Sequence, residues 1–115
     1  MIFCVEDDDN IRELVIYTLE TTGLEARGFA DGTAFMEALA FDTPELVLLD
    51  IMLPYRNGDT VLTAVRECST VPIIIISAKG TTQNKIDLLR LGADDYITKP
   101  FDMEEVLARI ESNLR

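Results

Sequence analysis

Histidine is absent from this chain of 115 residues, cysteine occurs only twice, and no hydrophobic run is long enough to cross a bilayer. Without an imidazole, any mechanism that needs a histidine as base, nucleophile or metal ligand within the chain is excluded. Cys4 and Cys68 lack the spacing of a redox or zinc motif, so we expect both to be reduced core residues of a cytoplasmic protein. The apolar run at 71–76 is interrupted by Pro72, and no basic segment followed by an apolar stretch opens the chain. Neither a membrane span nor a signal peptide is predicted.

Basic residues are also scarce. Lysine and arginine total 10 against 21 aspartates and glutamates, which gives a net charge of −11. A surface of this sign repels phosphate backbones, so we expect this segment alone to bind no nucleic acid. Hydrophobic residues at 48% and charged residues at 27% are typical of an ordinary globular domain, and the length suits one domain spanning residues 1–115.

Strand-like and helix-like patterns alternate five times along the chain. Strands are predicted at 2–5, 24–29, 46–49, 72–76 and 95–98, and an amphipathic helix is predicted after each of them. Apolar strands without polar alternation, separated by such helices, favour a parallel sheet covered on both faces. The predicted fold class is α/β, a doubly wound (βα)5 three-layer sandwich with a five-stranded parallel sheet.

Local signals punctuate this pattern. Gly23 and Gly92 are typical helix stops, and Pro54 with Asn57-Gly58 predicts a turn. Asp102 is predicted to cap the last helix, with Glu105 as its capping-box partner. The predicted buried face of that helix comprises Met103, Val106, Leu107, Ile110 and Leu114.

Reactive side chains collect where the predicted strands end: Glu6 and Asp7 after the first, Asp50 after the third, Ser77 after the fourth and Lys99 after the fifth. Because the carboxyl ends of parallel strands share one edge, these groups should converge. Two carboxylates about 4 Å apart repel each other by roughly 4 kcal/mol at an effective dielectric constant of 20, so three of them need a cation. Oxygen donors alone favour Mg²⁺ or Mn²⁺. A free carboxylate can attack phosphorus to give an acyl phosphate, so the pattern predicts a metal-assisted phosphoryl acceptor site.

Four stretches carry a resemblance that covers essentially the whole chain. The sequence resembles the response-regulator receiver domain of bacterial two-component signalling, which has a flavodoxin-like fold. The matching stretches are Val5-Glu6-Asp7-Asp8, Val47-Leu48-Leu49-Asp50-Ile51-Met52-Leu53-Pro54, Ile76-Ser77-Ala78 and Thr98-Lys99-Pro100-Phe101. The resemblance implies a phosphorelay function and no enzymatic activity beyond assisting the domain's own phosphorylation and dephosphorylation.

By this resemblance, Asp50 is the phosphoacceptor and takes its phosphoryl group from a phosphohistidine of a sensor histidine kinase. Mg²⁺ would be held by Asp7 directly, by Glu6 through water, by Asp50, and by the carbonyl of Met52. Lys99 would pair with the phosphoryl group, and its bond to Pro100 would be cis.

The resemblance also implies a switch. Ser77 would follow the phosphoryl group inward and let Tyr96 move from an exposed to a buried position. The chain departs mildly from the family pattern, because Ser77 stands where threonine is commoner and Glu6-Asp7 where two aspartates are.

The stretch 92–101 is similar to receivers of the OmpR/PhoB class, which carry a winged-helix DNA-binding domain. In that class the fourth helix, fifth strand and fifth helix form a symmetric dimer face. Lys85 with Glu105, and Asp95 with Arg109, match its interchain ion pairs, so a homodimer is expected on phosphorylation. Since the sequence stops at Arg115, we expect it to be the regulatory half of a transcription factor whose effector domain is absent from it.

Other functions compete with this interpretation. A haloacid-dehalogenase-type phosphohydrolase needs Asp-x-Asp, whereas Ile51 and Met52 follow Asp50. A flavodoxin-like flavin binder needs a Ser-, Thr- and Gly-rich phosphate loop, whereas 6–9 are all acidic. A pseudo-receiver that works without phosphorylation, and a stand-alone receiver that relays phosphate or docks on a partner, stay open.

Overall fold

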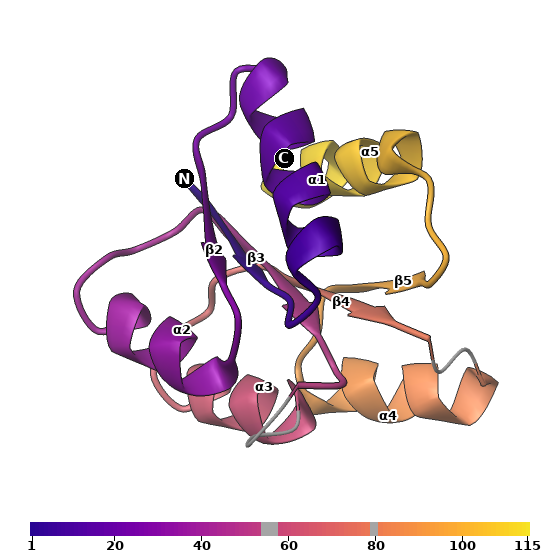
Figure 1. Cartoon of the computed structure of the whole chain (residues 1–115). Coiled ribbons are helices and arrows are strands. Elements are labelled where there is room, and N and C mark those ends of the chain that lie inside the picture. The colour runs from indigo at the N-terminus through magenta and orange to yellow at the C-terminus, as the bar shows by residue number, and fades with distance from the viewer. Residues whose placement is uncertain (54–57, 79–80) are drawn as a thin grey trace.

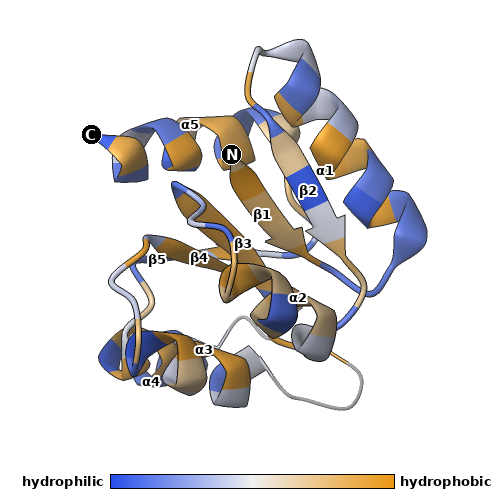
Figure 2. Ribbon diagram, turned by 90° about the vertical axis from the view of Figure 1, so that its left-hand side faces the viewer, coloured by the Kyte–Doolittle hydropathy of each residue, from blue (hydrophilic) through white to orange (hydrophobic). Residues whose placement is uncertain are grey.

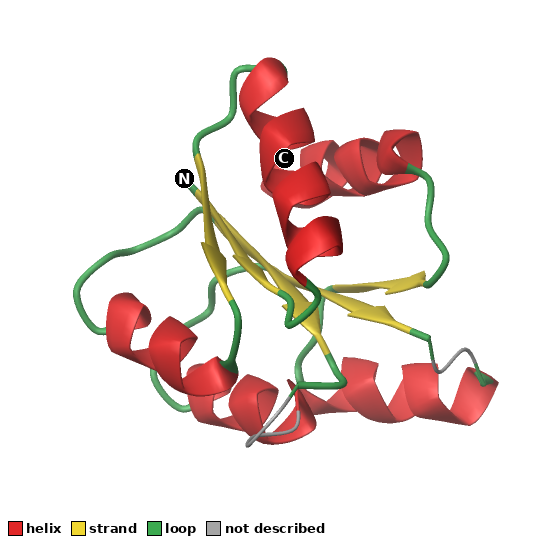
Figure 3. Ribbon diagram, viewed as in Figure 1, coloured by secondary structure: helices red, strands yellow, loops and turns green. Residues whose placement is uncertain are grey.

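The computed structural model describes residues 1–53, 58–78 and 81–115. Within them, strands and helices alternate strictly, as Figures 1 and 3 show. The elements are β1 (Ile2–Val5), α1 (Asp9–Thr21), β2 (Ala26–Phe29), α2 (Gly32–Leu39), β3 (Leu46–Asp50), α3 (Gly58–Arg66), β4 (Ile73–Ser77), α4 (Thr82–Leu91), β5 (Asp95–Thr98) and α5 (Met103–Leu114). The predicted turn at Pro54 and Asn57 lies outside the described residues.

The five strands form one parallel sheet in the order β2-β1-β3-β4-β5. Helices α1 and α5 cover one face of the sheet, and α2, α3 and α4 cover the other (Figure 1). The direction of the chain reverses across the sheet between β1 and β3, which is where ligands bind in folds of this kind. The predicted doubly wound sandwich is confirmed.

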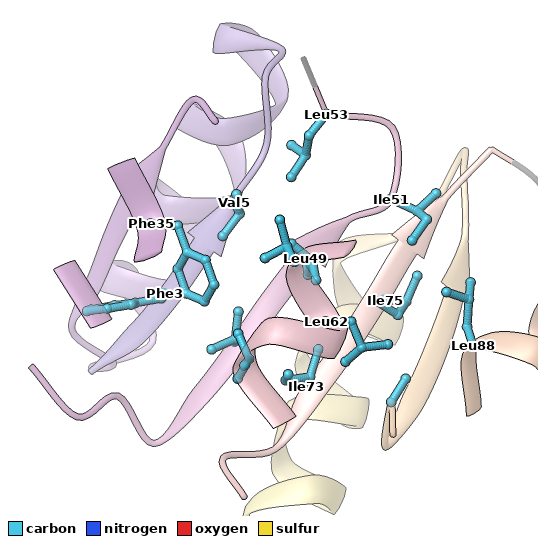
Figure 4. Packing of buried hydrophobic residues seen from close by; sticks show 14 of the residues in the cluster. Phe3, Val5, Phe35, Leu49, Ile51, Leu53, Leu62, Ile73, Ile75 and Leu88 are labelled. Atoms are coloured by element: carbon cyan, nitrogen blue, oxygen red, sulfur yellow. The ribbon is translucent and has the colours of Figure 1, made fainter. Parts of the chain in front are cut away.

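Successive residues of each central strand face opposite layers of the core, as a buried strand requires. In β1, Phe3 and Val5 pack toward α2 and α3, as Figure 4 shows, whereas Ile2 and Cys4 join the cluster on the side of α1 and α5. In Figure 2 the central strands are accordingly hydrophobic along their length, while the helices alternate in colour. The sheet thus stands between two hydrophobic layers, and in β1, β3 and β4 polar side chains are confined to the strand ends.

Helix boundaries follow the predicted signals closely. Gly92 ends α4 with a φ of +118°, a left-handed conformation that suits glycine. Asp102 caps α5, but its side chain accepts from the N–H of Glu104, and Glu105 instead accepts from Arg109. The predicted capping box is therefore replaced by a plain cap and an i,i+4 ion pair.

Three further expectations need correction. Leu114 is exposed, because the last turn of α5 runs past the sheet, while Val106 and Ile110 are fully buried. Cys68 is exposed beyond the end of α3, and only Cys4 is a core residue. Strand β2 begins at Ala26, two residues later than predicted. Among the described residues, none of the helices combines the length and apolar character needed to cross a bilayer.

Candidate functional site

The predicted site residues meet at the carboxyl edge of the sheet. Pairing of β1 with β3 sets Val5 opposite Leu49, and pairing of β3 with β4 sets Asp50 opposite Ile76. Strand β5 lies beyond β4, with Thr98 opposite Ser77. The residues that follow or end these strands therefore share one rim, as the parallel pattern predicted.

Lys99 forms the centre of an ionic cluster. Its ammonium nitrogen lies 2.7 Å from Oε1 of Glu6 and 3.0 Å from Oδ2 of Asp50. Both carboxylate side chains are almost completely buried, at 4% and 3% exposure. The N–H of Lys99 also donates to the carbonyl of Ser77, which fixes the lysine backbone to β4. We call Lys99, Glu6 and Asp50 the Lys99 cluster. Its peptide bond from Lys99 to Pro100 is cis, as the resemblance implied.

The cluster holds two buried acids against one base, and the pKa values reflect this. Burial, followed by the hydrogen bond with Asp50, raises the pKa of Glu6 to about 7. Burial works against the charged form of Lys99, but its hydrogen bonds to Glu6 and Asp50 raise its pKa above the ordinary value. The cluster is thus short of positive charge.

The acidic residues fit a hard divalent cation. Oxygens of Glu6, Asp7 and Asp50 all lie within 4.8 Å of one another, and Asp7 is the exposed member. The donor set contains only oxygen, and the crowded carboxylates gain from added positive charge. Met52, the fourth predicted ligand, adjoins them, because its N–H donates to Oδ1 of Asp50 at 3.0 Å. These residues could hold a metal such as Mg²⁺.

Ser77 and Tyr96 lie next to this cluster, on neighbouring strands. Ser77 is fully buried at the end of β4, and Tyr96 is 8% exposed on β5. Both line a cavity of about 260 Å³ whose other walls include Met52 of the β3 edge and Asn84 of α4. Tyr96 therefore adopts the buried position of the predicted switch, and its movement stays a prediction.

The four predicted dimer residues all make contacts within the chain. Arg109 donates to both carboxylate oxygens of Asp95, at 3.0 and 3.2 Å, and to Glu105 at 3.3 Å. The ammonium group of Lys85 lies 5.5 Å from the centre of the Tyr96 ring. Asp95 and Arg109 thus pair as predicted in type, but within one chain, and the interchain pairs stay predictions.

Sequence reasoning missed Arg12. This residue of α1 donates from Nη1 to the carbonyl of Glu6 at 2.8 Å and from Nη2 to Asp9 at 2.5 Å. It thereby contacts the backbone of a predicted metal ligand. The only signal in the sequence was an arginine one helical turn after Asp8 and Asp9, a pattern that is common on helix surfaces.

Sequence reasoning also missed a second charged network, at the amino edge of the sheet. Arg66 donates to the carbonyls of Gly92, Val71 and Ser69 and to the carboxylate of Asp94. Asp94 in turn accepts from the N–H of Ile73, the first residue of β4, at 2.8 Å. We call this the Arg66–Asp94 network. It joins the end of α3 to the starts of β4 and β5.

Comparison with known proteins supports the resemblance seen in the sequence. Residues 2–111 match the sequence model of the family described as response regulator receiver domain. "Response regulator ArlR" of Staphylococcus saprophyticus is 44% identical over 114 residues, which cover 99% of this chain and 52% of that protein. "Transcriptional regulatory protein CseB" of Streptomyces coelicolor is 42% identical over 111 residues, which cover 96% of this chain and 47% of that protein. The chain spans about half the length of these curated relatives.

Solved structures show the same fold. The BeF3-activated receiver domain of RstA from Klebsiella pneumoniae superposes with a TM-score of 0.94 at 34% identity, covering 99% of this chain and 97% of that one. The receiver domain of the Francisella response regulator 1452 superposes with a TM-score of 0.95 at 30% identity, covering 98% and 94% of the two chains.

Proposed function

This chain belongs to the family of response regulator receiver domains, and on that premise we propose that it accepts a phosphoryl group on Asp50 from a sensor histidine kinase. The observation that carries the proposal is the contact of the Asp50 carboxylate with Lys99, 3.0 Å away, beside Glu6 and Asp7. In a receiver domain this reaction serves signalling. Such a domain assists only its own phosphorylation and dephosphorylation.

The chemistry follows from the positions of the groups. A carboxylate oxygen of Asp50 attacks phosphorus, the bond from phosphorus to the kinase histidine breaks, and the imidazole leaves with that electron pair. Lys99 is already within hydrogen-bond distance of Asp50 and is placed to bind a phosphoryl oxygen. Ser77, at the end of the neighbouring strand, offers its hydroxyl to another.

The proposed cofactor is Mg²⁺, or Mn²⁺ in its place. Glu6, Asp7 and Asp50 would hold it with the carbonyl of Met52. When bound, the metal neutralises carboxylate and phosphoryl charge. The charge deficit of the Lys99 cluster supports this, because a divalent cation relieves the repulsion between its buried acids.

The proposed output uses the surface formed by α4, β5 and α5. Phosphorylation would draw Ser77 inward, hold Tyr96 buried and favour a homodimer through Lys85 with Glu105 and Asp95 with Arg109. The curated relatives are about twice as long, and one is named a transcriptional regulatory protein. We therefore propose that residues 1–115 are the single receiver domain of a cytoplasmic transcription factor that binds DNA through a further domain. A stand-alone receiver is the alternative.

Intact mass spectrometry after incubation with acetyl phosphate tests the acceptor. We expect one phosphoryl addition that requires Mg²⁺ and is lost in Asp50→Asn. Glu111→Gln is the matched control, because it removes an exposed acid from α5 and should leave the addition intact. Equal labelling of Asp50→Asn would show that another residue is the acceptor.

Sedimentation velocity tests the switch. We expect the phosphorylated domain to dimerise and phosphorylated Lys99→Ala to stay monomeric. A phosphorylated Lys99→Ala protein that dimerised normally would remove Lys99 from the switch.

A further inference from the structure

Arg12 reaches the predicted metal site from outside it. Its side chain leaves α1, is only 18% exposed, and ends with Nη1 at 2.8 Å from the carbonyl oxygen of Glu6. The second nitrogen, Nη2, is paired with Asp9 on the same helix. The guanidinium group is a planar fork, so these two bonds together fix its orientation.

The path of Arg12 depends on Gly28 in β2. A Cβ atom at Gly28 would lie 2.8 Å from Cδ and 3.0 Å from Cγ of Arg12, and 2.5 Å from Cδ1 of Ile16. Carbon atoms do not approach so closely, so a side chain at this position displaces both the Arg12 stem and the tip of Ile16. The close approach of these two side chains accounts for the glycine, since its backbone is otherwise ordinary strand.

The backbone of Glu6 is thus held on both sides. Its N–H donates to the carbonyl of Phe29 at 3.0 Å, which ties it to β2, and its carbonyl accepts from Arg12, which ties it to α1. The next peptide carries Asp7, the exposed member of the acidic group. A shift of this turn would move two carboxylates relative to Asp50.

We propose that Arg12, seated against Gly28, is a positioning residue that sets the affinity of the metal site through the backbone of Glu6. The proposal rests on the metal-binding part of the proposed function. It goes beyond that function, because neither Arg12 nor Gly28 is a ligand.

A purely electrostatic role of Arg12 and a positioning role predict opposite changes in Mg²⁺ affinity when the residue is replaced. A guanidinium near a divalent site repels the metal, so loss of its charge alone would strengthen Mg²⁺ binding. Loss of a group that orients a ligand weakens metal binding, by about tenfold at the lower end of what such changes cost. The sign of the change therefore separates positioning from simple electrostatics.

Titration of the ¹⁵N-labelled domain with MgCl₂, followed by amide NMR shifts, measures the dissociation constant. We expect Arg12→Met to raise it about tenfold and Arg12→Lys, which keeps a donor and the charge, to raise it less. Gly28→Ala should raise it in the same direction with the charge intact. The double variant should be no weaker than Arg12→Met, because both changes break one contact.

Arg27→Met is the matched control. It removes the same charge from β2, where Arg27 pairs with Asp42 instead of the acidic turn, and it should leave the dissociation constant within about twofold. Amide spectra without metal check that each variant is folded, and Gly28→Ala still tests the idea if Arg12→Met does not fold.

Unchanged or tighter Mg²⁺ binding in both Arg12→Met and Gly28→Ala would overturn the positioning role and leave the proposed function standing. A wild-type domain whose spectrum did not respond to Mg²⁺ would overturn the metal site itself, and this proposal with it.

Discussion

The two edges of the sheet carry charged clusters of opposite design. At the carboxyl edge, the Lys99 cluster sets one ammonium against the buried carboxylates of Glu6 and Asp50. At the amino edge, the Arg66–Asp94 network sets one guanidinium against one carboxylate, with backbone groups occupying the remaining positions. One cluster is unbalanced in charge, and the other is balanced.

The difference separates function from stability. In the part of the chain that the structure describes, no buried side-chain nitrogen or oxygen lacks a hydrogen-bond partner, so both clusters are satisfied locally. Of these two clusters, only the Lys99 cluster carries an excess of one sign, which favours binding of a cation or of a group that takes up negative charge. A balanced network holds the elements together, whereas an unbalanced one is prepared for a ligand.

The largest contrast between the edges is predicted for the two thiols. Burial, then the negative charge of Glu6, raises the pKa of Cys4 to about 12, so its thiol stays protonated at pH 8. Cys68, near the Arg66–Asp94 network, is exposed. Iodoacetamide at pH 8 should add one group to the native chain by intact mass, and none to Cys68→Ala. Modification of Cys4 at a similar rate would show that the carboxyl edge opens readily.

Breaking the balanced network should cost the most stability. Arg66→Met removes the guanidinium donor from three carbonyls and from Asp94, which keeps only the N–H of Ile73, and we expect a loss of about 3 kcal/mol in the free energy of unfolding by urea. Arg90→Met, an exposed change on α4, is the matched control and should cost less than about 0.5 kcal/mol. A loss below about 1 kcal/mol for Arg66→Met would remove the claimed asymmetry.

Removing one acid from the Lys99 cluster should instead increase the free energy of unfolding. Because the pKa of Glu6 rises from 4.5 to about 7 on folding, the stability it contributes below pH 4.5 is lost as the pH rises through 7. Glu6→Gln stays neutral, so without divalent metal at pH 8 we expect it to be more stable than the wild type by about 1–2 kcal/mol. The gain should vanish near pH 4.5. Urea titrations at the two pH values measure it, and a less stable variant at pH 8 would show that the pair with Lys99 dominates.

The smallest effect is expected at the surface pair of Arg109 with Asp95. Burial opposes the charge of Arg109, but its hydrogen bonds to Asp95 and Glu105 and their negative charges together raise the pKa of the guanidinium. The Arg109 side chain is 41% exposed, so Arg109→Met should cost only about 0.5 kcal/mol in the monomer. Thermal unfolding compared with the wild type checks this. A cost above about 2 kcal/mol would place a third structural network on α5.

The site at the carboxyl edge could be predicted from sequence because it depends on which residue directly follows each strand. Asp50 follows four apolar residues and Lys99 follows a short strand, and parallel pairing alone brings such strand ends together. The choice of partners could not be predicted. Glu6 is long enough to reach Lys99 at 2.7 Å, a contact that depends on side-chain conformation across the sheet.

The Arg66–Asp94 network at the amino edge could not be predicted from the sequence, for a different reason. Asp94 directly precedes β5 and Asp95 is its first residue, yet Asp94 pairs with Arg66 and Asp95 with Arg109. Strand alternation sends their side chains to different neighbours, and the partner of Asp94 is 28 residues away. Leu114 failed as a core prediction because helical spacing continues after the sheet that it would cover has ended.

The distance along the chain between the members of the Lys99 cluster has a consequence for synthesis. Lys99 meets Asp50 across 49 residues and only after β5 has paired with β4 at the edge of the sheet. Closing so long a loop is among the later events in folding. During synthesis, Asp50, the proposed acceptor, is therefore made long before Lys99, its ion-pair partner. The proposed ability to accept a phosphoryl group then depends on completion of the fold, so an incomplete chain would not respond to the kinase.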